Sequence, residues 1–388
     1  MSKTVKLMIP GPVDLWDETI DALGQQVRTN FDQDWTPIQE ETVGLLQQVF
    51  QTQNDLFILT ASGSGSVEIG VASLFSRGEK VAAVYNGPFA GRAIEILRAY
   101  DCQVVEIIGE WGQAIDLNQV ETVLNAHPDI AGLVVVANET GTGVRNPVEE
   151  LAQMIHARGL PIVVDAISGM GGYDLPVDKW ELDILCTSSN KALETPPGLG
   201  FISVSDRAWS IIDAKEEKGG RGWYYNLSTW KKYCSGEGRY APTTMATSLI
   251  IGLQASLKRI IEVETLAGHW ARYAWAQKAV RQGLHNIGFE MLAPEEAASF
   301  TVTSVCKHPS MEHEKEVREY LKTKHGFSVS GTWGQLEGKA FRVGHMGRAS
   351  SNEYLIPFLL GIEDFLRKDK GIHVPVGASL VGLEQPGY

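Results

Sequence analysis

Two residues in the middle of the chain have the types and the surroundings needed for chemistry at a buried site. Asp165 follows the apolar run 161–164, so its carboxylate needs a partner, such as a helix N-terminus, an arginine or the protonated nitrogen of a pyridine cofactor. Lys191 stands among small polar residues between two predicted strands. Desolvation there favours the neutral amine, which is the form that attacks an aldehyde. Lys191 is therefore a candidate nucleophile.

A short run of serine and glycine, 62–66, has the composition of an anion-binding loop. Ser64, Gly65 and Ser66 lie between a predicted strand and a predicted helix. Glycines allow close approach of the backbone, and hydroxyl and N–H groups at a helix start can bind phosphate. A serine-capped helix after a tight turn is the alternative. The run matches neither the Walker A nor the GxGxxG pattern, so ATP and NAD are not indicated.

Three more residues lie at or near the ends of predicted strands, and each has a functional and a structural interpretation. Phe89 could stack on a planar ring or pack in the core. Thr140, in the polar run 138–143, could bind a ligand or build a turn. Arg342, in the predicted strand 340–343, could hold a carboxylate through two hydrogen bonds or form a surface ion pair.

The elements that position these residues follow from hydrophobic periodicity. Apolar runs predict strands at 55–62, 80–85, 103–108, 130–137, 161–167, 184–188 and 200–204. Helical periodicity predicts helices at 67–75, 89–100, 117–126 and 148–158. This alternation is typical of a mostly parallel sheet buried on both faces, which binds ligands at the carboxyl ends of its strands.

The sequence pattern in the second half of the chain predicts a different arrangement of helices and strands. The stretch 206–240, rich in Lys, Glu, Gly, Trp and Tyr, is interpreted as a loop or an excursion of the chain near the active site. Long helices are predicted at 243–264 and 270–288. A compact α+β region then follows, with strands at 299–306, 327–330 and 340–343 and helices at 312–325 and 353–367.

Composition narrows the function classes. The 388 residues carry a net charge of −13, which disfavours binding to nucleic acid. No stretch approaches the roughly 20 apolar residues of a membrane span, and no signal peptide is recognised. The four cysteines share no CxxC spacing and the nine histidines no HExxH pattern, so neither a disulfide framework nor a metal site is predicted. A cytoplasmic enzyme is the expectation.

Taken together, these residues resemble the class V aminotransferases of fold type I, in particular the alanine–glyoxylate and serine–glyoxylate group. Asp165 precedes Lys191 by 26 residues (191 minus 165), and Thr140 precedes Asp165 by 25 (165 minus 140), as in that family. The blocks 191–201 and 341–347 are similar to its lysine and carboxylate-arginine blocks.

The resemblance implies an α/β fold of the pyridoxal 5'-phosphate (PLP) transferase type. A large domain, 15–255, would hold a mostly parallel seven-stranded sheet. A smaller α+β domain would comprise 256–388 together with 1–14. The active unit would be a homodimer with composite active sites.

The resemblance also implies roles for single residues. Lys191 would be the Schiff-base lysine and proton shuttle, Asp165 would pair with the pyridine nitrogen, and Arg342 would hold the substrate carboxylate. The other expected cofactor contacts are Phe89 on the ring, Thr140 beside the ring hydroxyl, Ser64, Gly65, Ser66 and Asn190 at the phosphate, and Tyr240 and Thr243 reaching the partner subunit's phosphate.

The implied activity is ping-pong transfer of an amino group from serine, alanine or aspartate to glyoxylate or pyruvate. Two departures from the family pattern leave the donor open: Ala137 replaces a histidine, and 30–35 lacks a His-Arg pair. A PLP lyase or desulfurase, with Cys306 as its only candidate thiol, is one alternative. A non-catalytic subunit on the same fold is another.

Overall fold

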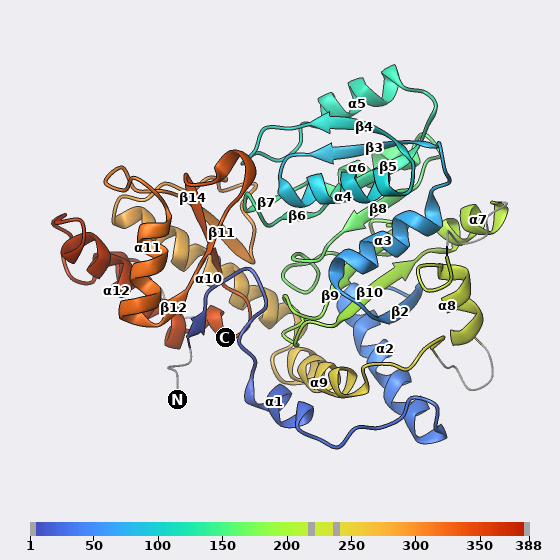
Figure 1. Cartoon of the computed structure of the whole chain (residues 1–388), viewed down its shortest axis with the longest axis horizontal. Coiled ribbons are helices and arrows are strands. Elements are labelled where there is room, and N and C mark those ends of the chain that lie inside the picture. The colour runs from blue at the N-terminus through green and yellow to red at the C-terminus, as the bar shows by residue number, and fades with distance from the viewer. Residues whose placement is uncertain (1–4, 216–221, 236–240, 384–388) are drawn as a thin grey trace.

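The computed structural model describes residues 5–215, 222–235 and 241–383, and its centre is a seven-stranded sheet (Figure 1). The strand order is β2-β10-β9-β8-β5-β3-β4, and only β10 runs antiparallel to its neighbours. The strands are β2 (Asp55–Thr60), β3 (Lys80–Tyr85), β4 (Gln103–Ile108), β5 (Ile130–Val136), β8 (Ile162–Asp165), β9 (Ile184–Ser188) and β10 (Leu199–Val204). The predicted α/β fold with a mostly parallel sheet is confirmed.

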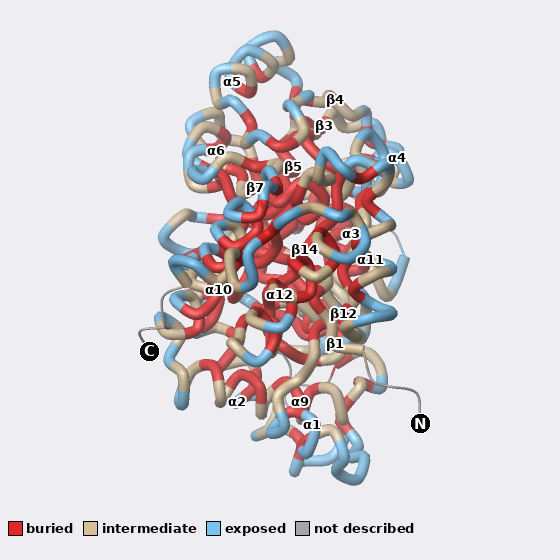
Figure 2. Tube along the Cα trace, turned by 90° about the vertical axis from the view of Figure 1, so that its left-hand side faces the viewer, coloured by how far each residue is buried: buried red, intermediate tan, exposed pale blue. Residues whose placement is uncertain are grey.

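Helices cover both faces of this sheet because each presents an apolar stripe. In α6 the buried residues Val148, Leu151, Ala152 and Ile155 recur at the spacing of one helix face. Figure 2 shows the result, with buried residues concentrated around the strands and exposed residues on the outer turns. The helices of this part are α1 (Asp17–Leu23), α2 (Thr36–Phe50), α3 (Gly63–Leu74), α4 (Pro88–Ala99), α5 (Leu117–Ala126), α6 (Val148–His156), α7 (Asp206–Ala214), α8 (Leu227–Cys234) and α9 (Thr247–Lys258).

A second hydrophobic core lies beside the sheet, in the orange and red elements of Figure 1. It includes Met8, Val280, Phe341 and Phe358. Its elements are α10 (Leu266–Asn286), β11 (Val302–Cys306), α11 (Lys315–Tyr320), β12 (Phe327–Ser328), β13 (Ser330–Gly331), β14 (Ala340–Gly344) and α12 (Asn352–Lys368). Strand β1 (Lys6–Leu7) pairs with β12, which ties the N-terminal segment to this core. The domain boundary near residue 255 stays a prediction.

The structure differs from the sequence-based expectation mainly in the segment that follows β10. The stretch 206–240 is not simply a loop, because it contains α7 and α8, capped by Ser205 and Asn226. The long helix expected at 243–264 is α9 followed by a π-helical turn, Arg259–Val263. Helices α7 and α8 are short, and their apolar faces consist of only a few residues. Their hydrophobic periodicity is therefore too weak to predict them from the sequence. No helix among the described residues has the length and apolarity to cross a membrane.

Candidate active site

A cavity of about 410 Å³ opens at the carboxyl ends of the parallel strands. Segments far apart in sequence meet here because parallel strands end on one edge of a sheet. Six residues singled out from the sequence line the cavity: Ser64, Phe89, Thr140, Asp165, Asn190 and Lys191. They follow β2, β3, β5, β8 and β9, and Asp165 is the last residue of β8. The structure thus brings most of the predicted site together.

Lys191 lies against the N-terminal segment. Its amine donates a hydrogen bond to the backbone carbonyl of Pro10. Gly11 passes so close, with φ +94°, that a Cβ there would lie 2.6 Å from the Cδ atom of Lys191. The pKa of Lys191 is lowered to about 8, chiefly by burial and then by the charge of Arg342, while the charge of Asp165 acts in the opposite direction. About a tenth of the amine is therefore neutral at pH 7, against well under a thousandth for an ordinary lysine, and the neutral form is the nucleophile.

Asp165 is buried, with 7% of its surface exposed. Its Oδ1 atom accepts a hydrogen bond of 2.9 Å from the N–H of Ile167. Burial raises the pKa of Asp165 to about 6, while that hydrogen bond and the charges of Arg92 and Lys191 act in the opposite direction. A cationic group in the cavity would stabilise the ionised carboxylate further.

Phe89 is positioned by a carboxylate to which the sequence analysis gave no role. Glu139 is fully buried and accepts hydrogen bonds from the N–H groups of Phe89 (3.0 Å), Ala90 (2.9 Å) and Gly141 (2.9 Å). Burial raises the pKa of Glu139 to about 7, against the pull of these donors. Because Glu139 binds the first turn of α4, it fixes the place of the Phe89 ring at the cavity wall. An acidic residue after a strand end was the only sequence signal for this contact.

Hydroxyl and amide groups line the wall beside Asp165. The hydroxyls of Thr140 and Ser168 lie 2.6 Å apart, and Ser168 donates to the carbonyl of Asn138 at 2.9 Å. Asn138 also lines the cavity, and its buried Oδ1 has no hydrogen-bond partner among the described residues. A buried amide oxygen without a partner is costly unless a ligand or water supplies a donor.

The serine-glycine run divides between the cavity and the interior. Ser64 lines the cavity at the start of α3, but Gly65 and Ser66 do not. The hydroxyl of Ser66 donates to the carbonyls of Gly63 (2.7 Å) and Thr187 (3.0 Å), so it faces the sheet. The N–H of Gly65 donates to the hydroxyl of Ser62 at 3.3 Å, as in the capped helix that was the alternative interpretation.

Arg92 is a cation at this end of the cavity that the sequence analysis missed. Its Nη1 atom lies 3.4 Å from the hydroxyl of Ser64, and its guanidinium lies over the ring of Phe89 at 4.9 Å from the centroid. On the neighbouring wall, the amide oxygen of Asn190 accepts a hydrogen bond of 3.0 Å from Ser188. The helix start, the arginine and these polar groups together favour an anion.

Arg342 and Thr243 lie outside the cavity lining. Arg342, with 7% of its surface exposed, donates from Nε to the carbonyl of Gly331 at 2.9 Å. The carbonyl of Thr243 accepts a hydrogen bond of 3.3 Å from Asn30, which also binds the N–H of Met245. Tyr240 lies outside the described residues. The roles of Arg342, Thr243 and Tyr240 stay predictions.

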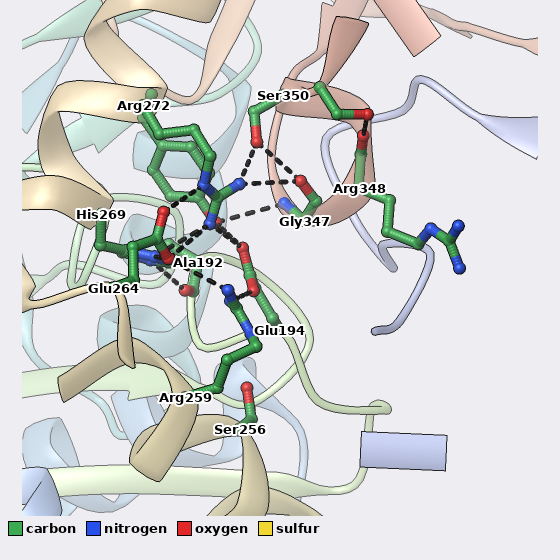
Figure 3. Close-up of polar contacts among 12 residues, drawn as sticks. Ala192, Glu194, Ser256, Arg259, Glu264, His269, Arg272, Gly347, Arg348 and Ser350 are labelled. Carbon is green, nitrogen blue, oxygen red and sulfur yellow. Dashed lines mark hydrogen bonds and ion pairs between the residues drawn. The ribbon is translucent and has the colours of Figure 1, made fainter. Parts of the chain in front are cut away.

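A buried charge network joins the lysine turn to the second core (Figure 3). Glu194 is fully buried, and its Oε1 atom accepts from Arg272 (2.8 Å) and from the hydroxyl of Tyr273 (2.6 Å). Arg259 binds the other carboxylate oxygen. Burial alone would raise the pKa of Glu194, but Arg272, Arg259 and His269 outweigh it and lower the pKa to about 2.

The same network reaches the turn that follows β14. Arg272 donates to the carbonyl of Gly347 at 3.0 Å (Figure 3). The N–H of Gly347 donates to the hydroxyl of Tyr273 at 3.2 Å. His269 contacts the carbonyl of Ala192, the residue after Lys191, at 3.1 Å. The turn that carries Lys191 and the strand that carries Arg342 are thereby held in one fixed relation. No local sequence signal identified this network, because its members lie far apart in the chain.

Comparisons with known proteins agree with this architecture. A family model described as aminotransferase class-V matches residues 19–350. An uncharacterized aminotransferase of Methanocaldococcus jannaschii is 35% identical, over 90% of this chain and 89% of its own length. The soluble hydrogenase 42 kDa subunit of Anabaena cylindrica is 30% identical, over 92% and 91%. The crystal structure of an alanine–glyoxylate aminotransferase from Nostoc sp. is 27% identical, with a TM-score of 0.90 over 95% of this chain and 96% of the other.

Proposed function

This chain belongs to the class-V aminotransferase family, and on that premise we propose that it moves the amino group of a small L-amino acid to glyoxylate or pyruvate. Enzymes of this family and fold depend on PLP. One observation carries the proposal: the amine of Lys191, with its pKa lowered to about 8, shares a cavity with the buried carboxylate of Asp165.

The residues around the cavity fit PLP. Its volume of about 410 Å³ lies within the roughly 300–1,000 Å³ of small-molecule sites. Ser64 and the start of α3, with Arg92 beside them, would hold the phosphate. Phe89 would cover one face of the ring, and Asp165 would keep a proton on its nitrogen. Bound PLP supplies a reactive carbonyl carbon and an electron-withdrawing ring.

The protein's own groups would then perform the binding and the proton transfers. Arg342 would bind the α-carboxylate of the substrate and so orient its Cα atom. The Nζ atom of Lys191 would remove the proton from the Cα atom of the bound substrate and hold it for return. The same residues would serve the 2-oxo acid in reverse, which gives a ping-pong reaction.

We further propose that the active unit is a homodimer in which Thr243 and Tyr240 reach the partner's phosphate site. The exposed Arg92 at the phosphate end supports this, because a neighbouring subunit there would cover a charged edge of the cavity. Mixing Lys191→Ala chains with chains carrying Tyr240→Phe and Thr243→Ala should restore one active site per mixed dimer. An active monomer in sedimentation would contradict the proposal.

A cytoplasmic location is proposed on the basis of the cysteines. All four are free, and Cys102 and Cys186 are buried, as expected of a protein that keeps its thiols reduced.

One comparison favours a second candidate function. The relative named as a soluble hydrogenase subunit would suit a chain that assembles with other proteins instead of acting alone. The retained pair Lys191 and Asp165 in one cavity argues for catalysis. A desulfurase has less support, because burial raises the pKa of the Cys306 thiol and so lowers its reactivity.

A screen of amino acids tests the proposed function directly. Each amino acid would be added alone to the PLP-loaded protein while the cofactor's absorbance is followed. We expect serine, alanine or aspartate to convert the bound cofactor to its amino form, and glyoxylate or pyruvate to reverse the change. Lys191→Ala is the control that should remain unchanged over the same period. The proposal fails if the 20 common amino acids all leave the spectrum unaltered.

A further inference from the structure

Trp333 lies between two residues of the proposed site that come from different parts of the chain. The centroids of its ring and the Phe89 ring are 5.3 Å apart, with an interplanar angle of 69°. The guanidinium carbon of Arg342 lies 4.7 Å from the Trp333 ring centroid. Trp333 thus links the ring at the cavity wall to the cation proposed to bind substrate.

The loop that carries Trp333 is held in place by packing. Trp333 lies between β13 and β14, and Gly334 follows it with φ +65°. A Cβ on Gly334 would lie 3.0 Å from the ring of Trp111, so the loop rests on that second tryptophan. With 38% of its surface exposed, Trp333 presents an apolar surface toward solvent.

Arg342 is oriented from two directions. Its Nε donates to the carbonyl of Gly331 at 2.9 Å, and the face of Trp333 supports its guanidinium. Among the described residues, no carboxylate lies within ion-pair distance of Arg342. The two terminal nitrogens of the fork are therefore available for one carboxylate, in the geometry that two parallel hydrogen bonds require.

The charges around Trp333 limit how many carboxylates a substrate can carry. Arg318, whose charge also acts on Arg342, is paired with Glu314 at 3.1 Å. The buried Glu139 also acts on Arg342, with negative charge. Arg92 lies on the other side of Phe89, beside Ser64. Among the described residues, Arg342 is the cation in contact with the Trp333 ring, and the ring beside Trp333 is the aromatic Phe89.

We propose that Trp333 is a specificity-determining residue that orients Arg342 toward a single α-carboxylate and disfavours donors with a second one. The inference rests on the proposed role of Arg342 and deepens it by naming the substrate class. A second carboxylate placed against the indole would lose water without gaining a cation. Alanine or serine, with small uncharged side chains, would therefore be preferred to aspartate.

The test measures carboxylate binding as well as turnover. Propionate and succinate, which cannot be transaminated, would be titrated calorimetrically into the PLP-loaded protein. We expect W333L to weaken propionate binding by about 2- to 30-fold, which is the 0.5–2 kcal/mol of a cation–π contact converted at 1.36 kcal/mol per tenfold. W333F, which keeps an aromatic face, should stay within about threefold of the wild type. The matched control is W180L, because Trp180 is half-buried and carries no arginine on its face in the described structure.

Kinetics supply the second measurement. The wild type should prefer alanine or serine to aspartate in kcat/KM, and W333L should reduce that preference while W180L preserves it. Preference of the wild type for aspartate would overturn the inference, as would equal propionate binding in W333L and the wild type. If R342K loses propionate binding while W333L does not, the inference on Trp333 falls and the proposed role of Arg342 stands. If both variants bind propionate like the wild type, the proposed roles of Trp333 and of Arg342 are both wrong.

Discussion

The amine of Lys191 donates its hydrogen bond to the carbonyl of Pro10, a residue 181 positions earlier in the chain. The N-terminal segment therefore contacts a residue of the cavity wall, although its own strand β1 pairs with the second core. The candidate nucleophile thus sits where the two cores and the N-terminal segment meet, and its reactivity depends on all three.

The lowered pKa of Lys191 predicts how cofactor capture depends on pH. Only the neutral amine attacks a carbonyl, and an amine with a pKa of about 8 becomes neutral more than two pH units below an ordinary lysine at 10.5. The rate of PLP attachment to cofactor-free protein should rise up to about pH 8 and then level off. Stopped-flow absorbance measures this rate, and borohydride reduction followed by peptide mapping should place the pyridoxyl group on Lys191. A rate that keeps rising to pH 10, or a label on another lysine, would contradict the assignment.

Gly11→Ala should impair cofactor attachment. The added Cβ would meet Lys191 Cδ at 2.6 Å and Nζ at 2.7 Å, and φ +94° is unfavourable for any residue with a Cβ. Gly78→Ala is the matched control, since Gly78 has φ +80° and no atom within 4 Å of its added Cβ. Both variants should lose about 1–2 kcal/mol of stability from the backbone. Only Gly11→Ala should contain less PLP per chain, which absorbance measures after denaturation.

Asp165→Asn should lower turnover without emptying the site. If the carboxylate keeps the ring nitrogen protonated, its removal costs about 2–4 kcal/mol of transition-state stabilisation, or roughly 30- to 1,000-fold in kcat. Asp183→Asn removes another buried carboxylate, which binds His156 and the N–H of Ile162, and should leave kcat nearly unchanged in the folded protein. Turnover of Asp165→Asn within threefold of the wild type would rule out the proposed role.

Although Asp165→Asn should lower turnover, it should raise the stability of the cofactor-free protein. The pKa of Asp165 rises from 3.8 to about 6 on folding, so between these values the folded state binds more protons than the unfolded state. Stability contributed by this group therefore falls as pH rises from about 4 to 6 and stays low above that. Asp165→Asn should stabilise the cofactor-free protein at pH 8, on the order of 1–3 kcal/mol, and have little effect at pH 4. Urea titrations at the two pH values measure the difference.

Arg342→Lys should weaken amino donor and 2-oxo acid alike, because both carry an α-carboxylate. A hydrogen bond to a charged group contributes about 1.5–3 kcal/mol, so a ten- to hundredfold fall in kcat/KM is the expected order. The absorbance of bound PLP should not change. Arg318→Lys is the control, because the Arg318 side chain is already paired with Glu314. If only one of the two half-reactions suffers, Arg342 contacts a side chain and not the shared carboxylate.

The sequence by itself determined the central sheet and the place of its chemistry. Strands 80–85, 103–108 and 184–188 have the predicted bounds. In β3 and β9 the side chains in the middle of the strand are buried on both faces and mostly apolar, whereas the edge strand β4 is only partly buried. Asp165 and Lys191 could be located because each follows such a run, and a polar residue at that position must find a partner. Local pattern reports burial and backbone conformation, so it was sufficient for these features.

Only the tertiary structure decided which distant groups meet. Ser66 faces the sheet while Ser64 faces the cavity, although both lie in one serine-glycine run. The contacts of Lys191 with Pro10, of Glu194 with Arg272 and of Trp333 with Phe89 join segments that local periodicity does not relate. The reason is physical: the period of a strand or helix specifies which face of one element is buried, whereas the path of the whole chain specifies what lies against that face.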